Sequence, residues 1–303
     1  MEPSRPLSEN VPTRNPDALI QGFERLGYIA DRALATAVYL AIELQKPLLI
    51  EGHSGLGKTE VAKVLASFLG AQLIRLQCYE GLDINSAVYE WNYQKQLLSI
   101  KIEENTDQTV EEKERHIFSE QFLLERPLLQ AILAVHAPPV LLIDEVDRAD
   151  EPFEAFLLEL LSDFQISVPE MGTIKARHIP HVVLTSNRTR ELSEALRRRC
   201  LYHWIDYPDF EKEMKIVHAR LPEVGKELSS QVVRFVRAVR HLDLSKPPGV
   251  AETLDCTRAV SALGKRELDV QAVEDTISCV VKTLDDGEKL KAAGIDRVLT
   301  EAL

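Results

Sequence analysis

The sequence is poor in cysteine and contains no long hydrophobic run. Its four cysteines, Cys78, Cys200, Cys256 and Cys279, lie far apart and form no C-x-x-C pair. A thiol metal site or a disulfide framework is therefore not expected, and buried reduced thiols are. No apolar run approaches the roughly 20 residues that span a bilayer, and the N-terminus lacks the apolar segment of a signal peptide. We expect a soluble cytoplasmic protein without a membrane span.

Positive charges are outnumbered by negative ones. The 303 residues include 36 Lys and Arg against 48 Asp and Glu, which gives a formal net charge of −12. This balance argues against a broad basic surface for nucleic acid, although a local pore or groove could still be positive. Apolar residues make up 45% of the chain, so a large core and two packed domains are expected.

The sequence does contain a phosphate-loop pattern, Gly52-x-x-x-x-Gly57-Lys58-Thr59, between an apolar run and a helix-forming segment. Glycines let the backbone turn so that successive N–H groups face phosphate oxygens, and the helix N-terminus adds unsatisfied donors. Lys58 would bind the β- and γ-phosphates, and the Thr59 hydroxyl would bind Mg²⁺. The pattern predicts a nucleoside triphosphate site made by Gly52, His53, Ser54, Gly55, Leu56, Gly57, Lys58, Thr59 and Glu60.

A second decisive run, residues 140–143, is fully apolar and ends in Asp144 and Glu145. Unbroken hydrophobicity suits a central parallel strand, and such sheets place ligands at the carboxyl ends of their strands. Asp144 would hold Mg²⁺ directly or through water, and Glu145 would polarise the attacking water. An ordinary acidic turn after a buried strand is the alternative, but the position downstream of a phosphate loop favours the site. We expect the strands over 48–50 and 140–143 to end side by side.

Two further polar features follow buried segments. The strand predicted over 181–185 leads into Asn187, whose amide could orient water or contact the γ-phosphate, although turn chemistry alone also favours Asn there. Ser193 can cap a helix over 194–199, which carries three consecutive arginines at 197–199. Successive residues are about 100° apart around a helix, so the three guanidiniums cannot share one face.

Periodicity and turn signals predict the remaining elements. Residues 103–116 are charge-rich and are expected to form a solvated surface segment. We expect a flexible lead-in over 1–17, an α/β nucleotide-binding domain over 18–208 and a helical domain over 209–303. The further predicted helices are 33–44, 83–90, 127–136, 153–162, 211–221, 226–241, 251–263, 270–284 and 288–303, and the further strands are 72–77, 97–102 and 201–205, with a hairpin over 165–178.

The ordered set of motifs resembles the AAA+ ATPases, and two longer strings resemble the MoxR family and its CoxD-like branch. The superfamily motifs are residues 52–59, 141–145, 185–187 and 195–199. The segments that resemble the MoxR family are 77–83 with 87–93, 46–52 and 246–253. The resemblance implies a P-loop NTPase fold of AAA+ type, with a parallel sheet flanked by helices and an all-α lid. It also implies a homohexameric ring that hydrolyses ATP with Mg²⁺. In this branch the ring acts as a chaperone-like remodeller, together with a von Willebrand factor A-domain protein, in the maturation of a client metalloenzyme.

The same resemblance assigns roles to individual residues. Asn187 matches the first sensor. Arg199 lies where an arginine finger acting in trans is expected, and Arg198 is the second choice. Arg258 matches the second sensor on the lid, although Cys256 stands where close relatives commonly have Trp.

The base of the nucleotide and the partner surface are assigned from the resemblance as well. Tyr28 and Ile29 fall where the adenine pocket should lie. The insertion around residues 89–91 is expected to face the client or partner, although Trp91 and Tyr93 could equally be packing residues.

Two other functions use the same core motifs. A nucleic-acid motor is disfavoured by the acidic balance and by the lack of a basic, aromatic-laced tail. A scaffold that binds nucleotide without turnover is disfavoured by the intact set of Lys58, Asp144, Glu145 and Arg199.

Overall fold

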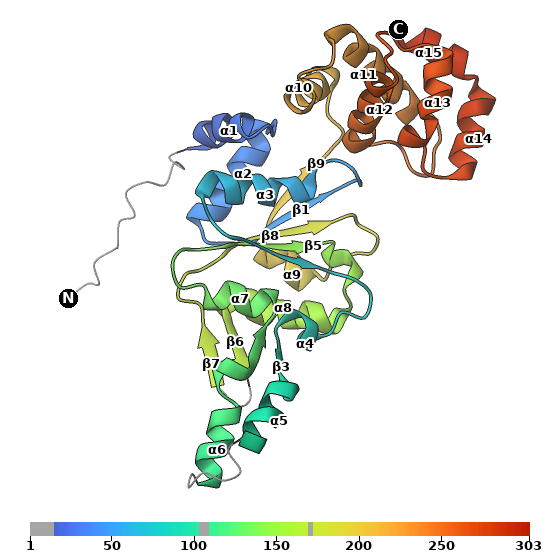
Figure 1. Ribbon diagram of the computed structural model, residues 1–303. Helices are drawn as coiled ribbons and strands as arrows, with labels where there is room; N and C mark the ends of the chain where they lie inside the picture. The colour runs from blue at the N-terminus through green and yellow to red at the C-terminus, as the bar shows by residue number, and fades with distance from the viewer. Residues whose placement is uncertain (1–14, 103–108, 169–171) are drawn as a thin grey trace. The chain divides into compact units, whose positions relative to one another are not determined.

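Figure 1 shows the computed structural model, which describes residues 15–102, 109–168 and 172–303. The chain divides into two compact units. The first unit contains residues 36–51 and 65–203, and the second contains the described part of residues 12–35 together with 52–64 and 204–303. The domain boundary near residue 208 stays a prediction.

The first unit is built on a five-stranded sheet with the order β2-β5-β8-β1-β9. The strands are β1 (Leu48–Gly52), β2 (Leu73–Gln77), β5 (Val140–Asp144), β8 (His181–Ser186) and β9 (Leu201–Ile205), of which Gly52 and residues 204–205 belong to the second unit. The neighbours β2, β5, β8 and β1 run parallel to one another. Every residue of β1 and β5 is buried, as their unbroken apolar runs predict. The two strands do not end side by side, because β8 lies between them.

Helices α7 (Pro127–Leu133) and α8 (Glu151–Asp163) cover one face of this sheet (Figure 1). Asp150 caps α8, since its side chain accepts a hydrogen bond from the Phe153 backbone N–H at 2.9 Å. The buried apolar residues of α8 belong to the same core as Leu141, Ile143 and Leu184 of the sheet. Helix α7 ends at Leu133, three residues before the end of the helix predicted over 127–136.

The segment after β2 differs from the sequence prediction. The helix predicted over 83–90 is shorter: Asp83 caps α4 (Ile84–Ala87), which ends at Ala87, and β3 (Tyr89–Trp91) then pairs antiparallel with β4 (Leu123–Glu125). The strand predicted over 97–102 is wrong, because these residues belong to helix α5 (Tyr93–Ile102). Asn92 starts that helix by accepting a hydrogen bond from the Lys95 backbone N–H at 3.0 Å.

The remaining parts of the first unit follow the prediction more closely. Strands β6 (Gln165–Val168) and β7 (Gly172–Lys175) form the expected hairpin, whose tip at 169–171 lies outside the described residues. Within the predicted surface segment, 103–108 also lie outside them, and α6 (Val110–Ile117) is helical. The prediction of α9 (Glu194–Arg199) with a Ser193 cap is confirmed. All four cysteines are free thiols; Cys78 and Cys256 are buried, as predicted, whereas Cys200 and Cys279 are only half-buried.

The second unit is mainly helical. Residues 16 and 17, predicted as part of a flexible lead-in, begin helix α1, whereas 1–14 lie outside the described residues. The helix predicted over 288–303 is wrong in its continuity, because Gly294 at φ +81° separates α14 from α15. The helix predicted over 270–284 is too long, because α13 ends at Val280 and Leu284 begins α14. The helices are α1 (Pro16–Arg25), α10 (Phe210–Arg220), α11 (Lys226–Arg240), α12 (Val250–Ala262), α13 (Val270–Val280), α14 (Leu284–Ala293) and α15 (Ile295–Ala302).

Two helices contribute residues to both units, namely α2 (Arg32–Glu43) and α3 (Lys58–Leu69). Helix α3 ends at a glycine, since Gly70 adopts φ +62° directly after it. No helix in the described parts of the chain combines the length and hydrophobicity that crossing a membrane requires.

Candidate functional site

The phosphate loop connects β1 to α3 and belongs to the second unit. Gly55 and Gly57 adopt φ of +76° and +82°, which is the left-handed region that glycine enters without strain. The buried Lys58 ammonium donates hydrogen bonds to the Gly52 carbonyl at 2.8 Å and to the His53 carbonyl at 2.7 Å. The loop therefore wraps around its own lysine at the start of α3.

Helix α12 contacts this loop through its first turn. The Ala251 backbone N–H donates a hydrogen bond to the Gly55 carbonyl at 3.0 Å. The backbone approach at Gly249 is so close that a Cβ atom there would lie 2.8 Å from the Ser54 carbonyl oxygen. The N-terminus of α12 and the phosphate loop are thus in direct backbone contact.

A buried ion pair supports the turn that precedes α12. Arg240 pairs with the fully buried Glu213 through two hydrogen bonds of 2.7 and 2.5 Å. The same guanidinium donates to the carbonyls of Pro248 at 2.6 Å and Gly249 at 3.2 Å. Thr253 completes the network by donating to Glu213 at 2.6 Å. A buried pair satisfied in this way holds its surroundings in one geometry.

A cavity of about 450 Å³ opens beside the phosphate loop within the second unit. This volume lies in the range of small-molecule sites, about 300–1,000 Å³. Seven of the predicted residues line the cavity, whereas Gly52, His53, Ser54, Lys58 and Thr59 do not. The seven are Tyr28, Ile29, Gly55, Leu56, Gly57, Glu60 and Arg258.

Two ionisable groups of this cavity have shifted pKa values. Burial raises the pKa of Tyr28, and the charges of Asp31 and Glu60 raise it further, so the phenol stays neutral. Burial opposes ionisation of Glu60, but Arg220, at 2.7 Å, and Lys63 outweigh it and lower the pKa of Glu60. The cavity therefore presents a neutral phenol and an ionised, paired carboxylate.

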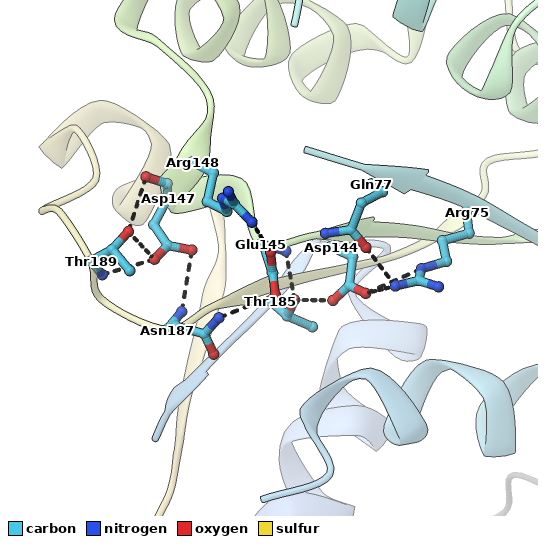
Figure 2. A network of polar contacts seen from close by, with 9 residues as sticks. All are labelled: Arg75, Gln77, Asp144, Glu145, Asp147, Arg148, Thr185, Asn187 and Thr189. Carbon is cyan, nitrogen blue, oxygen red and sulfur yellow. Dashed lines mark hydrogen bonds and ion pairs between the residues drawn. The ribbon is translucent and has the colours of Figure 1, made fainter. Parts of the chain in front are cut away.

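The end of β5 carries the second group of predicted residues, in the first unit (Figure 2). The buried Asp144 accepts a hydrogen bond at Oδ1 from the Thr185 hydroxyl at 2.5 Å. Its Oδ2 accepts from the Arg75 guanidinium, at 3.1 Å from Nε and 2.5 Å from Nη2. Thr185 also accepts from the Glu145 backbone N–H at 2.9 Å, so its hydroxyl connects the two acidic residues.

Glu145 is brought together with Asn187, as Figure 2 shows. The Asn187 amide donates to Oε1 of Glu145 at 3.4 Å, and Arg148 donates to Oε2 at 3.2 Å. Glu145 adopts φ +54°, a conformation that costs energy for a residue with a side chain and that concentrates at functional sites. The structure thus aims the Glu145 carboxylate at the side chain that follows β8.

Sequence analysis missed Asp147, which orders the turn after β8. Its buried carboxylate accepts hydrogen bonds from the backbone N–H groups of Asn187 at 3.2 Å and Thr189 at 2.8 Å, and from the Thr189 hydroxyl at 2.7 Å. A carboxylate three residues after Asp144 was the available signal. Nearby, burial and the charge of Asp144 raise the pKa of Cys78 to about 12, so this thiol stays protonated.

The three arginines of α9 point in different directions, as predicted. Arg197 lies 3.5 Å from the buried Glu51, and Arg198 pairs with Glu194 on its own helix at 2.5 Å. Arg199 is exposed and forms no ion pair or side-chain hydrogen bond with any residue that the structure describes. Arg199 is therefore the one of the three that has no ion-pair partner among the residues that the structure describes.

Two aromatic residues of the insertion after β2, Trp91 and Tyr93, have different surroundings. Trp91 is buried and packs edge-on against Phe118, with ring centroids 5.3 Å apart. Tyr93 is 63% exposed. Packing is thus the role of Trp91, and Tyr93 presents its ring to solvent.

The parallel sheet, the phosphate loop at the end of β1 and the C-terminal helices define a P-loop protein with the AAA+ fold. The model of the AAA domain (dynein-related subfamily) matches residues 47–200, and the chain belongs to this family. Members of the AAA+ class generally bind and hydrolyse ATP, typically with Mg²⁺, and assemble into rings.

Individual relatives are distant. An uncharacterized protein of Staphylococcus epidermidis is 25% identical over 251 residues, which cover 80% of this chain and 85% of that protein. One of Staphylococcus haemolyticus is 24% identical over 271 residues, covering 87% and 94%. Among solved structures, the Thermotoga maritima RuvB Holliday junction branch migration motor is similar with a TM-score of 0.46 and 18% identity, covering 88% of this chain and 72% of that chain.

Proposed function

We propose that this protein is an ATP-hydrolysing AAA+ remodelling ATPase of the MoxR type, which assists the maturation of a partner metalloenzyme. The observation that carries the hydrolytic part is the geometry at the end of β5. There the Glu145 carboxylate accepts a hydrogen bond from the Asn187 amide at 3.4 Å, next to the buried Asp144. A scaffold without turnover needs no such carboxylate.

The residues present fit Mg²⁺-bound ATP. Thr59 and Asp144 offer the hydroxyl and carboxylate oxygens that this ion prefers, and the ion would neutralise charge on the phosphates. No group of three or more His, Cys, Asp or Glu side chains in the described parts of the chain could hold a metal alone. Magnesium at nucleotide sites characteristically takes one or two carboxylates and completes its shell with phosphates and water.

The chain's own side chains divide the remaining work. Lys58 and the N–H groups of the loop would bind the phosphates. Glu145 would polarise the attacking water and accept its proton. Asn187 would orient the Glu145 carboxylate or the water. Tyr28, Ile29 and Arg258, which share a cavity of about 450 Å³ with the loop glycines, would hold the base and sense the nucleotide.

Assembly into a ring would complete the site. Arg199 is exposed and lacks a partner within the described residues, which supports its role as the finger supplied to a neighbouring subunit. Arg198 is a weaker candidate because Glu194 engages it at 2.5 Å. An arginine supplied in trans is worth about 10³–10⁵ in rate, so activity would depend on assembly into a homohexamer.

The partner assignment rests on the MoxR-like strings at 77–93 and 246–253. A von Willebrand factor A-domain protein and a client metalloenzyme are the expected partners. Since Trp91 is buried, the exposed Glu90 and Tyr93 remain as the contact residues of the insertion. The net charge of −12 argues against a nucleic-acid motor, and ATPase stimulation by DNA would favour that alternative.

Replacement of Glu145 by glutamine tests the hydrolytic function. Glu145→Gln should bind ATP with unchanged affinity but release phosphate at least about 100-fold more slowly, because the general base is lost. Glu159→Gln, the same change at an exposed position of α8, is the matched control and should keep wild-type turnover. Equal phosphate release by Glu145→Gln and wild type would remove Glu145 from the mechanism.

A further inference from the structure

Asp144 has a charged partner on the neighbouring strand. Strand β2 runs parallel to β5 with Gln77 opposite Asp144. Arg75 lies two residues before Gln77, so both side chains project from the same face of β2. The Arg75 guanidinium reaches along this face and donates to Oδ2 of Asp144 at 3.1 and 2.5 Å and to Oε1 of Gln77 at 2.5 Å (Figure 2).

Protein donors therefore engage both oxygens of the carboxylate that is proposed to hold Mg²⁺. Thr185 donates to Oδ1 at 2.5 Å, and Arg75 donates twice to Oδ2. A guanidinium and a divalent cation repel each other, so they cannot share one carboxylate oxygen without loss of affinity.

The two partners of the ion pair differ in their freedom to move. The Asp144 side chain is 3% exposed, whereas the Arg75 side chain is 48% exposed. Arg75 can turn into water at small cost, as exposed charges do. Asp144 cannot leave, and a buried carboxylate without a counter-charge is strongly destabilising. The ion pair can thus exchange its cation while the carboxylate stays in place.

We propose that Arg75 is a displaceable counter-ion of Asp144. It neutralises the buried carboxylate in the absence of nucleotide and leaves Oδ2 when Asp144 takes part in holding Mg²⁺. The inference rests on the proposed function, which assigns Asp144 to the metal. Because release of Arg75 is part of metal binding, its cost weakens the apparent affinity for Mg²⁺. Arg75 is a positioning residue, and its removal should make Mg²⁺ bind more tightly.

The experiment measures binding of a fluorescent ATP analogue to the full-length protein across a series of Mg²⁺ concentrations. The Mg²⁺ concentration at half-saturation should fall by about fivefold or more in Arg75→Gln, the lower end of coupling between linked binding events. The matched control is Arg126→Gln, since Arg126 pairs with Glu90 at the same distance, 2.5 Å, and is similarly exposed at 43%. The control should keep the wild-type Mg²⁺ dependence.

A second measurement uses stability. Nucleotide-free Arg75→Gln should melt at a lower temperature than wild type, because the buried Asp144 carboxylate loses the charge and the two hydrogen bonds of Arg75. Addition of Mg²⁺ and the analogue should then raise its melting temperature more than that of wild type, since a tighter ligand stabilises more. If Arg75→Gln does not fold, Arg75→Lys, which keeps the charge but loses the forked geometry, should shift the Mg²⁺ dependence in the same direction.

The outcomes separate this inference from the proposed function. If wild type binds the nucleotide and the Arg75 variants keep the wild-type Mg²⁺ dependence, this inference is wrong and the proposed function is unaffected. A higher Mg²⁺ requirement in Arg75→Gln also overturns it, because Arg75 would then help to bind the nucleotide. If wild type binds no nucleotide at any Mg²⁺ concentration, the proposed function fails and this inference falls with it.

Discussion

Replacement of Gly249 by alanine should disturb the phosphate loop from the helical side. Gly249 is the N-cap of α12 and adopts φ −86°, which any residue can adopt, so backbone strain does not enter. The added Cβ would lie 2.8 Å from the Ser54 carbonyl oxygen and 3.0 Å from the carbonyl carbon and oxygen of Gly55. These are backbone atoms and cannot rotate away as a side chain could. The loop or the first turn of α12 must therefore move.

The size of the effect follows from these distances. Ordinary van der Waals contact begins at 3.4 Å, so the backbone has to yield by 0.6 Å at Ser54 and by 0.4 Å at Gly55. Overpacking of this kind costs about 1–3 kcal/mol. Because the displaced residues are those whose N–H groups are proposed to face the phosphates, we expect ATP affinity to fall about tenfold, equivalent to about 1.4 kcal/mol.

Gly225→Ala provides the matched control. Gly225 is the N-cap of α11 with φ −58°, and a Cβ there would meet no atom within 4 Å. The modest cost of alanine at an N-cap is common to both variants, so their difference isolates the contact with the loop. Calorimetric titration with ATP in the presence of Mg²⁺ gives the ATP affinity of both variants, and urea unfolding gives their free energy of unfolding. Equal affinity and equal unfolding free energy in the two variants would refute the reasoning.

Two further predictions concern assembly and pH. Arg199→Ala should impair hydrolysis, and addition of Glu145→Gln subunits, which keep the finger, should partly restore phosphate release; the trans assignment is wrong if mixing restores nothing while rings still form. Burial opposes ionisation of Asp286, but hydrogen bonds from Ser245 and from the backbone of Lys246 outweigh it and lower its pKa from 3.8 to about 2. Since the folded-state pKa is depressed, the stabilisation is present above pH 3.8 and is lost as the pH falls toward 2. Asp286→Asn should therefore be less stable than wild type at pH 7, with a difference that shrinks by pH 2 in urea titrations; a constant difference would contradict the shifted pKa.

Local patterns predicted the elements whose burial is uniform. Strands β1 and β5 are buried along their whole length, so an unbroken apolar run marks each of them within a residue or two. Helix α9 follows equally from its serine cap. The phosphate-loop pattern is itself local, and it located the loop between β1 and α3 without any tertiary information.

The wrongly predicted elements lack such a local sequence pattern. Helix α5 buries only Gln96 among its residues, and Leu97, Leu98 and Ile102 are exposed, so its sequence lacks the periodic apolar stripe that identifies a helix. A single glycine within a helical pattern does not by itself predict a helix end. Gly294 nevertheless adopts φ +81°, which ends α14 and separates it from α15. Neither the exposed apolar face nor the sign of a dihedral angle is visible in the sequence.

The supporting contacts of the site depend on pairings distant in sequence. Arg75 meets Asp144 only because β2 pairs with β5 in a register that sets Gln77 opposite Asp144. Asn187 reaches Glu145 because β8, and not β1, is the neighbour of β5. Motifs identify the candidate site residues, since each motif is a short stretch of chain, whereas the sheet order decides which residues contact them.

The exposure of an arginine decides what its ion pair can do. Arg75 and Arg240 each engage a buried carboxylate at 2.5 Å, yet their side chains are 48% and 7% exposed. An exposed guanidinium regains its hydration when it leaves, so another cation can replace it. A buried guanidinium that also donates to the carbonyls of Pro248 and Gly249 would lose every partner at once. Arg75, the partner of Asp144, is therefore the one we propose to be exchangeable, whereas Arg240 is a buried support for the turn that contacts the phosphate loop.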